Sequence, residues 1–272
     1  MKKTTSLIFL TTLSFILPLY LSSSLCFISN LFDYELDEVQ PLKVMTYNIR
    51  GARSFDGQVD LSTVISQIRS MDPDIIALQE IDYRLPRTHF QNQAKQLGVQ
   101  LEMNYVFIPN INFVIGSYGS AILSKFPITE YEYTALPSRL EKRGVLRAQI
   151  RRGTQSIDVY ATHLGLNYHE RTEQINTLTT MMSKTTGPKI LLGDFNAKPM
   201  ETSMEFIRSQ YIDPVFEQQL QVTTYRHHDK DVQIDYIFHS PNFIFENVFS
   251  EASLISDHHP LMYSLILHSP ME

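Results

Sequence analysis

The sequence of 272 residues contains no tryptophan and only one cysteine, Cys26. A single cysteine cannot form an internal disulfide, and it excludes a zinc site built from several thiolates. The chain also lacks an excess of positive charge. Its formal net charge is −6 at pH 7, so composition gives no global footprint for nucleic acid, although a local basic groove stays compatible with it. With 43% hydrophobic and 19% charged residues, the composition is that of a globular protein.

The first thirty residues contain no acidic side chain and differ from the rest of the chain. Lys2 and Lys3 form a short positive region, an apolar run follows over Leu7–Leu21, and the small residues Ser22–Ser24 come next. This order is typical of a secretory signal. We therefore interpret residues 1–30 as a signal peptide and expect an exported protein that is periplasmic, envelope-associated or secreted.

Two alternatives for this segment stay open. An uncleaved membrane anchor is less favoured, because Pro18 interrupts a run that is already short for a span. Lipid attachment to Cys26 is less favoured, because lipoprotein signals need a small residue where this chain has Leu25. The acid-rich residues 31–41 are interpreted as a linker into the domain.

After residue 41 the hydrophobic pattern alternates between strands and helices with no further linker. Short apolar, β-branched runs predict strands at Leu42–Ile49, Ile75–Leu78, Tyr105–Ile108, Ala121–Leu123, Ile128–Tyr133, Val145–Ile150, Ile157–Thr162, Lys189–Leu192, Gln233–Phe238, Phe243–Phe249 and Leu261–Leu267. Helical spacing predicts helices over residues 61–72, 90–98, 169–183 and 202–209. This pattern predicts one α/β domain over residues 42–268, with two packed sheets flanked by helices.

Polar residues stand where several of these strands begin or end, which is where a rigid sheet presents functional groups. They are Asn48, Glu80, His163, Asp194 with Asn196, Asp235, and Asp257 with His258. Each has an ordinary alternative as a solvated cap, a turn residue or a surface ion pair. Six such places in one chain favour a common site.

These side chains support one coherent chemistry. Glu80 and Asn48 offer the hard oxygen ligands that Mg²⁺ or Mn²⁺ prefers. Asp194 could orient and deprotonate a water for attack on phosphorus. Asn196 and His163 could donate hydrogen bonds to phosphoryl oxygens as charge builds. Asp235 is a second carboxylate available to His258, and such a partner fixes the tautomer and raises the pKa of an imidazole.

The motifs that carry these residues resemble those of the endonuclease/exonuclease/phosphatase superfamily. They are TYNIRG (46–51), DPDIIALQE (72–80), YGSAILSKFPI (118–128), THLGL (162–166), ILLGDFNAKP (190–199), IDYIF (234–238) and SDHHP (256–260). Their order and spacing match the superfamily over residues 42–268, and the combination is highly specific.

The resemblance implies a four-layer α/β sandwich of two facing mixed β-sheets flanked by helices, a Mg²⁺ or Mn²⁺ ion, and hydrolysis of a phosphate ester. It places Asn48, Glu80 and Asp257 on the metal side of the site. It gives His163 a phosphate contact, Asp194 and Asn196 the water-activating and phosphate-orienting places, and Asp235 the support of His258. The chain departs from DNA-repair members of the superfamily at Arg50, where they carry an acid, and this favours an anionic substrate. Arg50, Arg143 and Asn167 are the residues that we assign to substrate binding.

The substrate class is less constrained than the chemistry. A nuclease would need a long basic groove and stacking aromatics, whereas a lipid phosphodiesterase would need an exposed apolar loop at the mouth of the site. Residues 108–118 could form such a loop, although a buried strand and turn is the preferred interpretation. We expect a phosphodiester rather than a monoester, with a lipid or small-molecule headgroup favoured and a membrane surface as a compatible partner. A secreted nuclease and an inactive binding module remain alternatives. We expect a monomer with no obligate protein partner.

Overall fold

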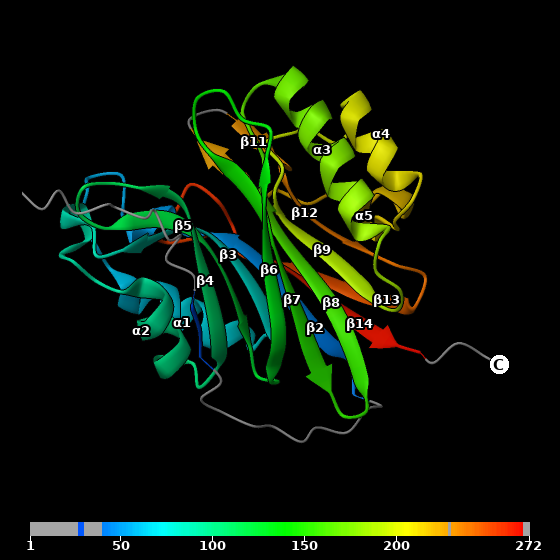
Figure 1. The fold of residues 1–272 in the computed structure, drawn as a ribbon, viewed down its shortest axis with the longest axis horizontal. Coiled ribbons are helices and arrows are strands. Elements are labelled where there is room, and N and C mark those ends of the chain that lie inside the picture. Colours follow the sequence, from blue (N-terminus) through cyan, green and yellow to red (C-terminus); the bar gives the residue numbers. More distant parts are fainter. Residues whose placement is uncertain (1–26, 30–39, 228–229, 269–272) are drawn as a thin grey trace, which may run out of the picture.

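Two large mixed β-sheets face each other at the centre of the molecule in the computed structural model, which describes residues 27–29, 40–227 and 230–268 (Figure 1). Helices cover the outer face of each sheet, which makes four layers in the order helix, sheet, sheet, helix. This confirms the fold class expected from the sequence.

The first sheet contains seven strands in the spatial order β1-β4-β5-β3-β2-β14-β13. Their bounds are β1 Phe27–Ser29, β2 Leu42–Asn48, β3 Ile75–Tyr83, β4 Asn104–Asn112, β5 Ser117–Ser124, β13 Phe243–Ser250 and β14 Leu261–Leu267. The second sheet contains five strands in the order β12-β9-β8-β7-β6. Their bounds are β6 Ile128–Leu136, β7 Arg143–Arg152, β8 Gln155–His163, β9 Lys189–Asp194 and β12 Asp235–His239.

The helices lie between the strands that the sequence pattern predicts. Their bounds are α1 Leu61–Met71, α2 Gln93–Gln100, α3 Tyr168–Met182, α4 Thr202–Arg208 and α5 Pro214–Glu217. Helices α1 and α2 pack on the first sheet, and α3 and α4 pack on the second. The prediction for the second helix was wrong at both ends: α2 begins after its cap Asn92 and continues through Gly98, and Phe90 lies outside it. The pattern also missed α5, β1 and the small hairpin of β10 (Tyr225–His227) and β11 (Lys230–Val232).

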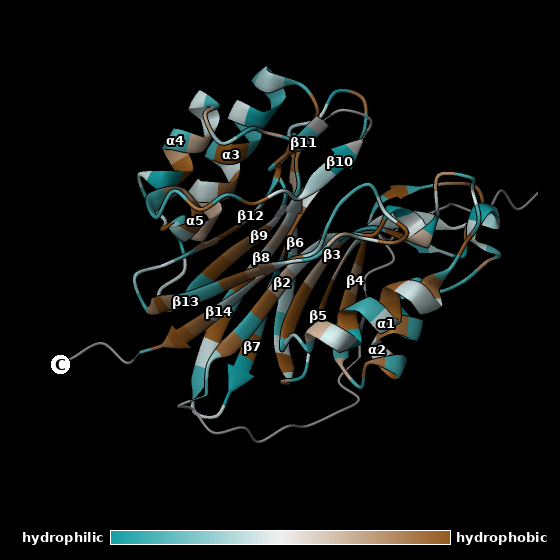
Figure 2. Ribbon diagram, turned by 180° about the vertical axis from the view of Figure 1, so that it is seen from behind, coloured by the Kyte–Doolittle hydropathy of each residue, from teal (hydrophilic) through white to brown (hydrophobic). Residues whose placement is uncertain are grey.

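The core between the sheets follows from the two-residue period of the strands. On β2, Val44 faces the second sheet, whereas Met45 and Tyr47 face the helices. On β9, Leu192 faces inward and Leu191 faces the helices. Apolar side chains line both faces of the central strands. Much of the ribbon of these strands has the colour of hydrophobic residues in Figure 2. Residues further along these strands that point inward in the same alternation are therefore also enclosed between the two sheets.

Two parallel strand pairs bring polar inward positions to one edge of the sandwich. Strands β2 and β3 are parallel and are joined through α1, and strands β8 and β9 are parallel and are joined through α3. Asn48, His163 and Asp194 are the last residues of β2, β8 and β9, and Glu80 lies in the carboxyl-terminal half of β3. Since β2 and β3 also contact β9 across the interior, these four residues converge.

The N-terminal predictions lie mostly outside the described residues. Residues 1–26 and 30–39 lie outside the described ranges, so the signal peptide and most of the linker stay predictions. Residues Phe27–Ser29, inside the segment interpreted as a signal, form β1 and pair with Tyr105–Phe107 of β4. Within the described part of the chain, no helix has the length and apolar character needed to span a membrane.

Candidate active site

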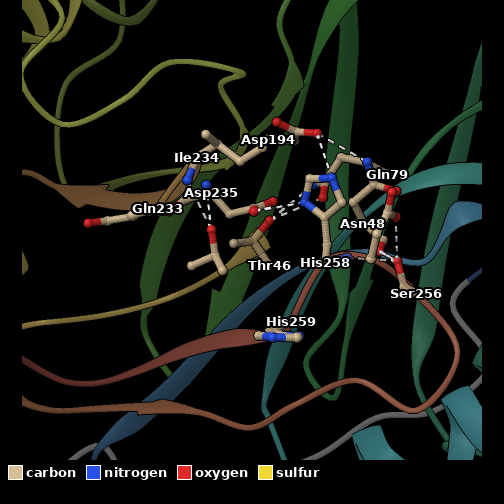
Figure 3. Close-up of polar contacts among 12 residues, drawn as sticks. Thr46, Asn48, Gln79, Asp194, Gln233, Ile234, Asp235, Ser256, His258 and His259 are labelled. Carbon is tan, nitrogen blue, oxygen red and sulfur yellow. Dashed lines mark hydrogen bonds and ion pairs between the residues drawn. The ribbon is translucent and has the colours of Figure 1, made fainter. Parts of the chain in front are cut away.

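Asn48 links the two halves of the site. Its side-chain amide nitrogen donates to Glu80 Oε1 at 3.1 Å. It also donates to Asp194 Oδ2 at 3.1 Å (Figure 3). Its oxygen Oδ1 accepts a hydrogen bond from the main-chain nitrogen of Arg50. Asn48 therefore holds the Glu80 carboxylate from the first sheet and the Asp194 carboxylate from the second. Of these two acids, Glu80 is the one whose oxygen atoms we assign to a cation.

Strict alternation along β3 would point Glu80 toward the helices, on the face of Leu78 and Ile76. The pairing of β3 with β5 shifts register between Leu78 and Ile81, and Glu80 adopts a left-handed φ of 59°. A bulge of this kind re-aims a side chain at the cost of local strain. The bulge is what turns Glu80 toward Asn48.

Glu80 lies among other charged groups of the site. Burial raises its pKa, and the charges of Asp194 and Asp257 raise the pKa further, against the lowering effects of the Asn48 hydrogen bond and the His258 charge. Within the described ranges no Lys, Arg or His forms an ion pair with Glu80. A carboxylate enclosed beside other carboxylates with only a neutral amide partner fits the oxygen-donor site of a divalent cation.

The imidazole of His258 lies between two carboxylates, those of Asp235 and Asp194. Asp235 and Asp194 are paired opposite each other on β12 and β9. The imidazole of His258 reaches between them, with Nδ1 at 2.9 Å from Asp235 Oδ2 and Nε2 at 3.6 Å from Asp194 Oδ2 (Figure 3). All three side chains are buried.

This arrangement keeps His258 protonated. Burial alone would lower its pKa, but the charges of Asp235 and Asp194 and the hydrogen bond to Asp235 outweigh burial and raise the pKa to about 10. The three residues have ligand atoms within 4.8 Å of one another, as in a metal site. An imidazolium has no free lone pair to give to a metal, so the group is better described as a fixed cation between two carboxylates.

Asp194 stands at the centre of the site. Burial and the charge of Asp235 raise its pKa to about 6, although the His258 cation and the Asn48 hydrogen bond lower it. His163 Nε2 lies 3.4 Å from the same oxygen, Asp194 Oδ2. Burial, with the charges of Arg143 and His258, lowers the pKa of His163 well below its usual value, so its imidazole is neutral. The main-chain nitrogen of Asn196 donates to Asp194 Oδ1, and its amide donates to the Leu164 carbonyl.

Both of the predicted substrate-binding arginines lie at the site, each beside an acid. Arg50 Nε is 3.9 Å from Asp257 Oδ1. Arg143 is buried and binds Glu141 through both terminal nitrogens, at 2.9 and 3.1 Å. Burial raises the pKa of Glu141, and the charges of Glu80 and Asp194 add to this, so Glu141 belongs to the same electrostatic site.

The structure places Asn167 apart from these contacts. Its side chain caps α3 by accepting hydrogen bonds from the main-chain nitrogens of His169 and Glu170. It is exposed, and no hydrogen bond among the described residues joins it to the other predicted site residues. The described contacts therefore give Asn167 a structural task.

Sequence reasoning missed several residues that hold the site together. Ser256 Oγ donates to the Asn48 carbonyl and accepts from the main chain of His258, which ties the last loop to β2. Thr224 Oγ1 accepts from the main-chain nitrogen of Asp235. The SDHHP motif contains Ser256 and could have signalled it, whereas Thr224 and Glu141 stand in no motif. His259, also in that motif, lies apart from the cluster (Figure 3).

Comparisons with known proteins agree with the geometry. The model of the Endonuclease/Exonuclease/phosphatase family matches residues 45–258, which confirms the resemblance read from the motifs. An uncharacterized Escherichia coli protein, YbhP, is 29% identical over 167 residues, which are 57% of this chain and 66% of that protein. The matched stretch thus spans slightly less than two thirds of this relative.

Solved structures share the fold at lower identity. An endonuclease/exonuclease/phosphatase from Beutenbergia cavernae superposes with a TM-score of 0.68 at 22% identity, over 85% of this chain and 72% of that one. A mannosyl-6-phosphatase from Bacteroides thetaiotaomicron superposes with a TM-score of 0.66 at 20% identity, over 83% of this chain and 100% of that one. At such identities the likeness concerns the fold alone.

Proposed function

This chain belongs to the endonuclease/exonuclease/phosphatase family, whose members hydrolyse phosphate esters, and we propose that it is an exported hydrolase of phosphodiesters that depends on a divalent metal ion. Lipid or small-molecule headgroups are the proposed substrates. The observation that carries the proposal is the buried imidazolium of His258, held between Asp235 and Asp194 beside Glu80.

His258 supplies fixed positive charge where negative charge develops. Its Nδ1 is committed to Asp235, so Nε2–H is the donor available to a phosphoryl oxygen placed near Asp194. A donor fixed before the reaction stabilises the transition state without the cost of reorganisation. Neutral His163, whose Nε2 lies 3.4 Å from the same oxygen, Asp194 Oδ2, offers a second donor.

Asp194 is the proposed base. With a pKa of about 6 it is ionised at neutral pH, yet it is basic enough to accept a proton from a water as that water attacks phosphorus. Hydrogen bonds from Asn48 and from the main chain of Asn196 fix the positions of its two oxygens.

Glu80 would hold the divalent cation, with Asp257 close enough for its charge to act on Glu80 and Asn48 keeping the Glu80 carboxylate in place. Oxygen donors favour Mg²⁺ or Mn²⁺. When bound, such an ion polarises a phosphoryl oxygen and neutralises charge at the leaving group. The chain's own residues supply the base and the second positive charge.

The pairing of the arginines favours a diester over a monoester. Arg50 faces Asp257 and Arg143 is bound to Glu141, so both cations already have a carboxylate partner. A dianionic monoester requires more uncompensated positive charge than a monoanionic diester does. The absence of tryptophan and the net charge of −6 support a lipid or small headgroup over a nucleic acid.

A substrate panel tests this proposal. With Mg²⁺ or Mn²⁺, the protein should hydrolyse bis-nitrophenyl phosphate faster than nitrophenyl phosphate or mannose 6-phosphate. Phosphoinositides or sphingomyelin should be cleaved in preference to plasmid DNA and RNA. A His258→Ala variant serves as the background control. Preferential release of phosphate from the monoesters, or digestion of DNA alone, would contradict the proposal.

A further inference from the structure

Three loops beside the site end in exposed apolar side chains. We call this surface the apolar lobe: Phe55 after β2, Phe90 after β3, and Phe113–Ile115 at the turn between β4 and β5. In Figure 1 these loops lie together at the left of the molecule. Phe113, Val114 and Ile115 are 52%, 104% and 54% exposed. Three consecutive exposed apolar residues at a hairpin tip are costly in water unless another surface covers them.

The hairpin tip is held in place and does not fold back onto the protein. The main-chain nitrogen of Phe113 donates to the Gly116 carbonyl, and Ser117 Oγ donates to Asn112 Oδ1 across the base of the turn. Gly116 has a left-handed φ of 76°, and a side chain there would come within 2.5 Å of the main-chain oxygens of Tyr83 and Arg84. Strand β3 therefore supports the tip from below.

The apolar lobe is also basic. Its loop segments 50–57, 84–90 and 112–116 contain four arginines and one acid, Asp56, in a chain whose net charge is −6. Arg50 lies over the ring of Phe55 at 4.8 Å, and Arg84 is exposed beside the hairpin. Arg87 is paired with the buried Asp82. The exposed cations beside the apolar tips are therefore Arg84 and Arg87, and an anionic bilayer accepts both apolar tips and exposed cations.

We propose that the apolar lobe docks on an anionic phospholipid bilayer and presents a lipid phosphodiester headgroup to the adjoining Glu80 and Asp194. The substrate part of this inference rests on the proposed function, and the docking part does not. The aliphatic tip residues Val114 and Ile115 favour acyl chains over bases, whereas the exposed phenylalanine rings of the lobe offer faces for base stacking. Single-stranded DNA is therefore the competing ligand in the test of docking.

The absence of tryptophan gives a direct test of docking. A Val114→Trp variant of the full chain carries one indole at the tip, and an Ile244→Trp variant on exposed β13 is the matched control. With phosphatidylcholine vesicles containing phosphatidylglycerol, the tip indole should shift to shorter wavelength and be quenched by brominated acyl chains. The control indole should do neither. The same spectrum for both variants, or a shift of the tip indole with single-stranded DNA but not with vesicles, would overturn the docking.

A second variant separates docking from catalysis. Phe113→Ser with Ile115→Ser should lower hydrolysis of a headgroup embedded in vesicles by about tenfold, because less apolar surface leaves water. Hydrolysis of soluble bis-nitrophenyl phosphate should stay unchanged in this variant. The control variant Phe206→Ser with Phe249→Ser loses two exposed apolar side chains outside the lobe and should keep both activities. Equal loss on both substrates would contradict the inference. If wild type cleaves neither substrate while the tip indole still inserts, the proposed function fails and the docking stands.

Discussion

His258 is the residue whose charge the site depends on most. Its imidazole is buried, and an isolated buried imidazole loses its proton. Asp235 on one side and Asp194 on the other reverse this and raise its pKa to about 10. Because Asp235 Oδ1 has no hydrogen-bond partner among the described residues, the bond from Oδ2 to His258 is the main polar contact of that carboxylate.

Replacing Asp235 should therefore act through His258. In Asp235→Asn the imidazole loses a charged partner, so its pKa falls from about 10 and the alkaline limb of the kcat profile moves to lower pH. His258 is active as a cation, so activity is present below its pKa and disappears as pH rises through it. His258→Ala should lower kcat by about 10²–10⁴ with little change in KM.

The double variant completes this test. Because the two residues act as a unit, Asp235→Asn should add little to His258→Ala. The measurement is kcat and KM against pH for each variant, with circular dichroism as the folding control. Independent, multiplying losses, or an alkaline limb that Asp235→Asn leaves in place, would refute the coupling.

Motifs predicted single residues well where an inward polar side chain stands at or near the start or the end of a strand. Asn48, His163, Asp194, Asp235 and His258 came from such places, and the structure brings them together. Glu141 could not be found in this way, because it lies in the β6–β7 loop and not at a strand boundary with a motif. It belongs to the site through its ion pair with Arg143. Asn167 shows the opposite case, since a polar residue after a strand also caps the following helix.

At the scale of elements, hydrophobic period predicted nearly every strand but could not predict irregularity within one. Apolar alternation along β3 gives no sign that the register shifts after Leu78, because the bulge depends on pairing with β5. The same limit applies to α2, where Gly98 looks like a stop although the helix continues. Tertiary packing overrides the local preference there, since a side chain at Gly98 would come within 2.6 Å of the Tyr105 ring.

The N-cap of α1 makes a testable contribution at this scale. Asp60 accepts hydrogen bonds from Ser62 Oγ, Thr63 Oγ1 and the main chain of Thr63, and these lower its pKa to about 2. Asp60→Ala should lower the free energy of unfolding by about 1 kcal/mol at neutral pH. Part of the contribution is present above the ordinary carboxyl pKa and is lost as pH falls toward 2.

Asp60→Asn is the matched control, because it keeps a capping oxygen but cannot titrate. Urea unfolding at pH 7 and pH 3 compares the three proteins. If Asp60→Ala unfolded at the same urea concentration as wild type at pH 7, the cap would be dispensable.

At the scale of the whole molecule, the sequence predicted two packed sheets, and the site exists because they face each other. Glu80 belongs to the first sheet and Asp194 to the second, and the Asn48 amide spans the gap between them. Sequence period assigns each residue to a strand but carries no information on which strands of the two sheets oppose each other. The family motifs supplied that part of the prediction.

Export is the prediction that belongs to the entire chain. We expect mass spectrometry of the exported protein to find a new N-terminus between about Ser22 and Asn30, within the usual length of secretory signals. Pairing of Phe27–Ser29 with β4 favours cleavage ahead of Phe27, which would leave β1 in place. An intact Met1 would indicate an anchor instead, and a diacylglycerol mass on Cys26 would indicate a lipoprotein.

Metal titration of diester hydrolysis tests the central claim most directly. Bis-nitrophenyl phosphate cleavage should vanish in chelator and return with Mg²⁺ or Mn²⁺ for wild type. Glu80→Gln should need a much higher metal concentration for half activity. It should also lose most of the metal-induced rise in Tm, because the carboxylate that faces the cation is gone. Full activity of wild type in chelator, or the same metal requirement in Glu80→Gln, would contradict a metal-dependent phosphodiesterase built on Glu80.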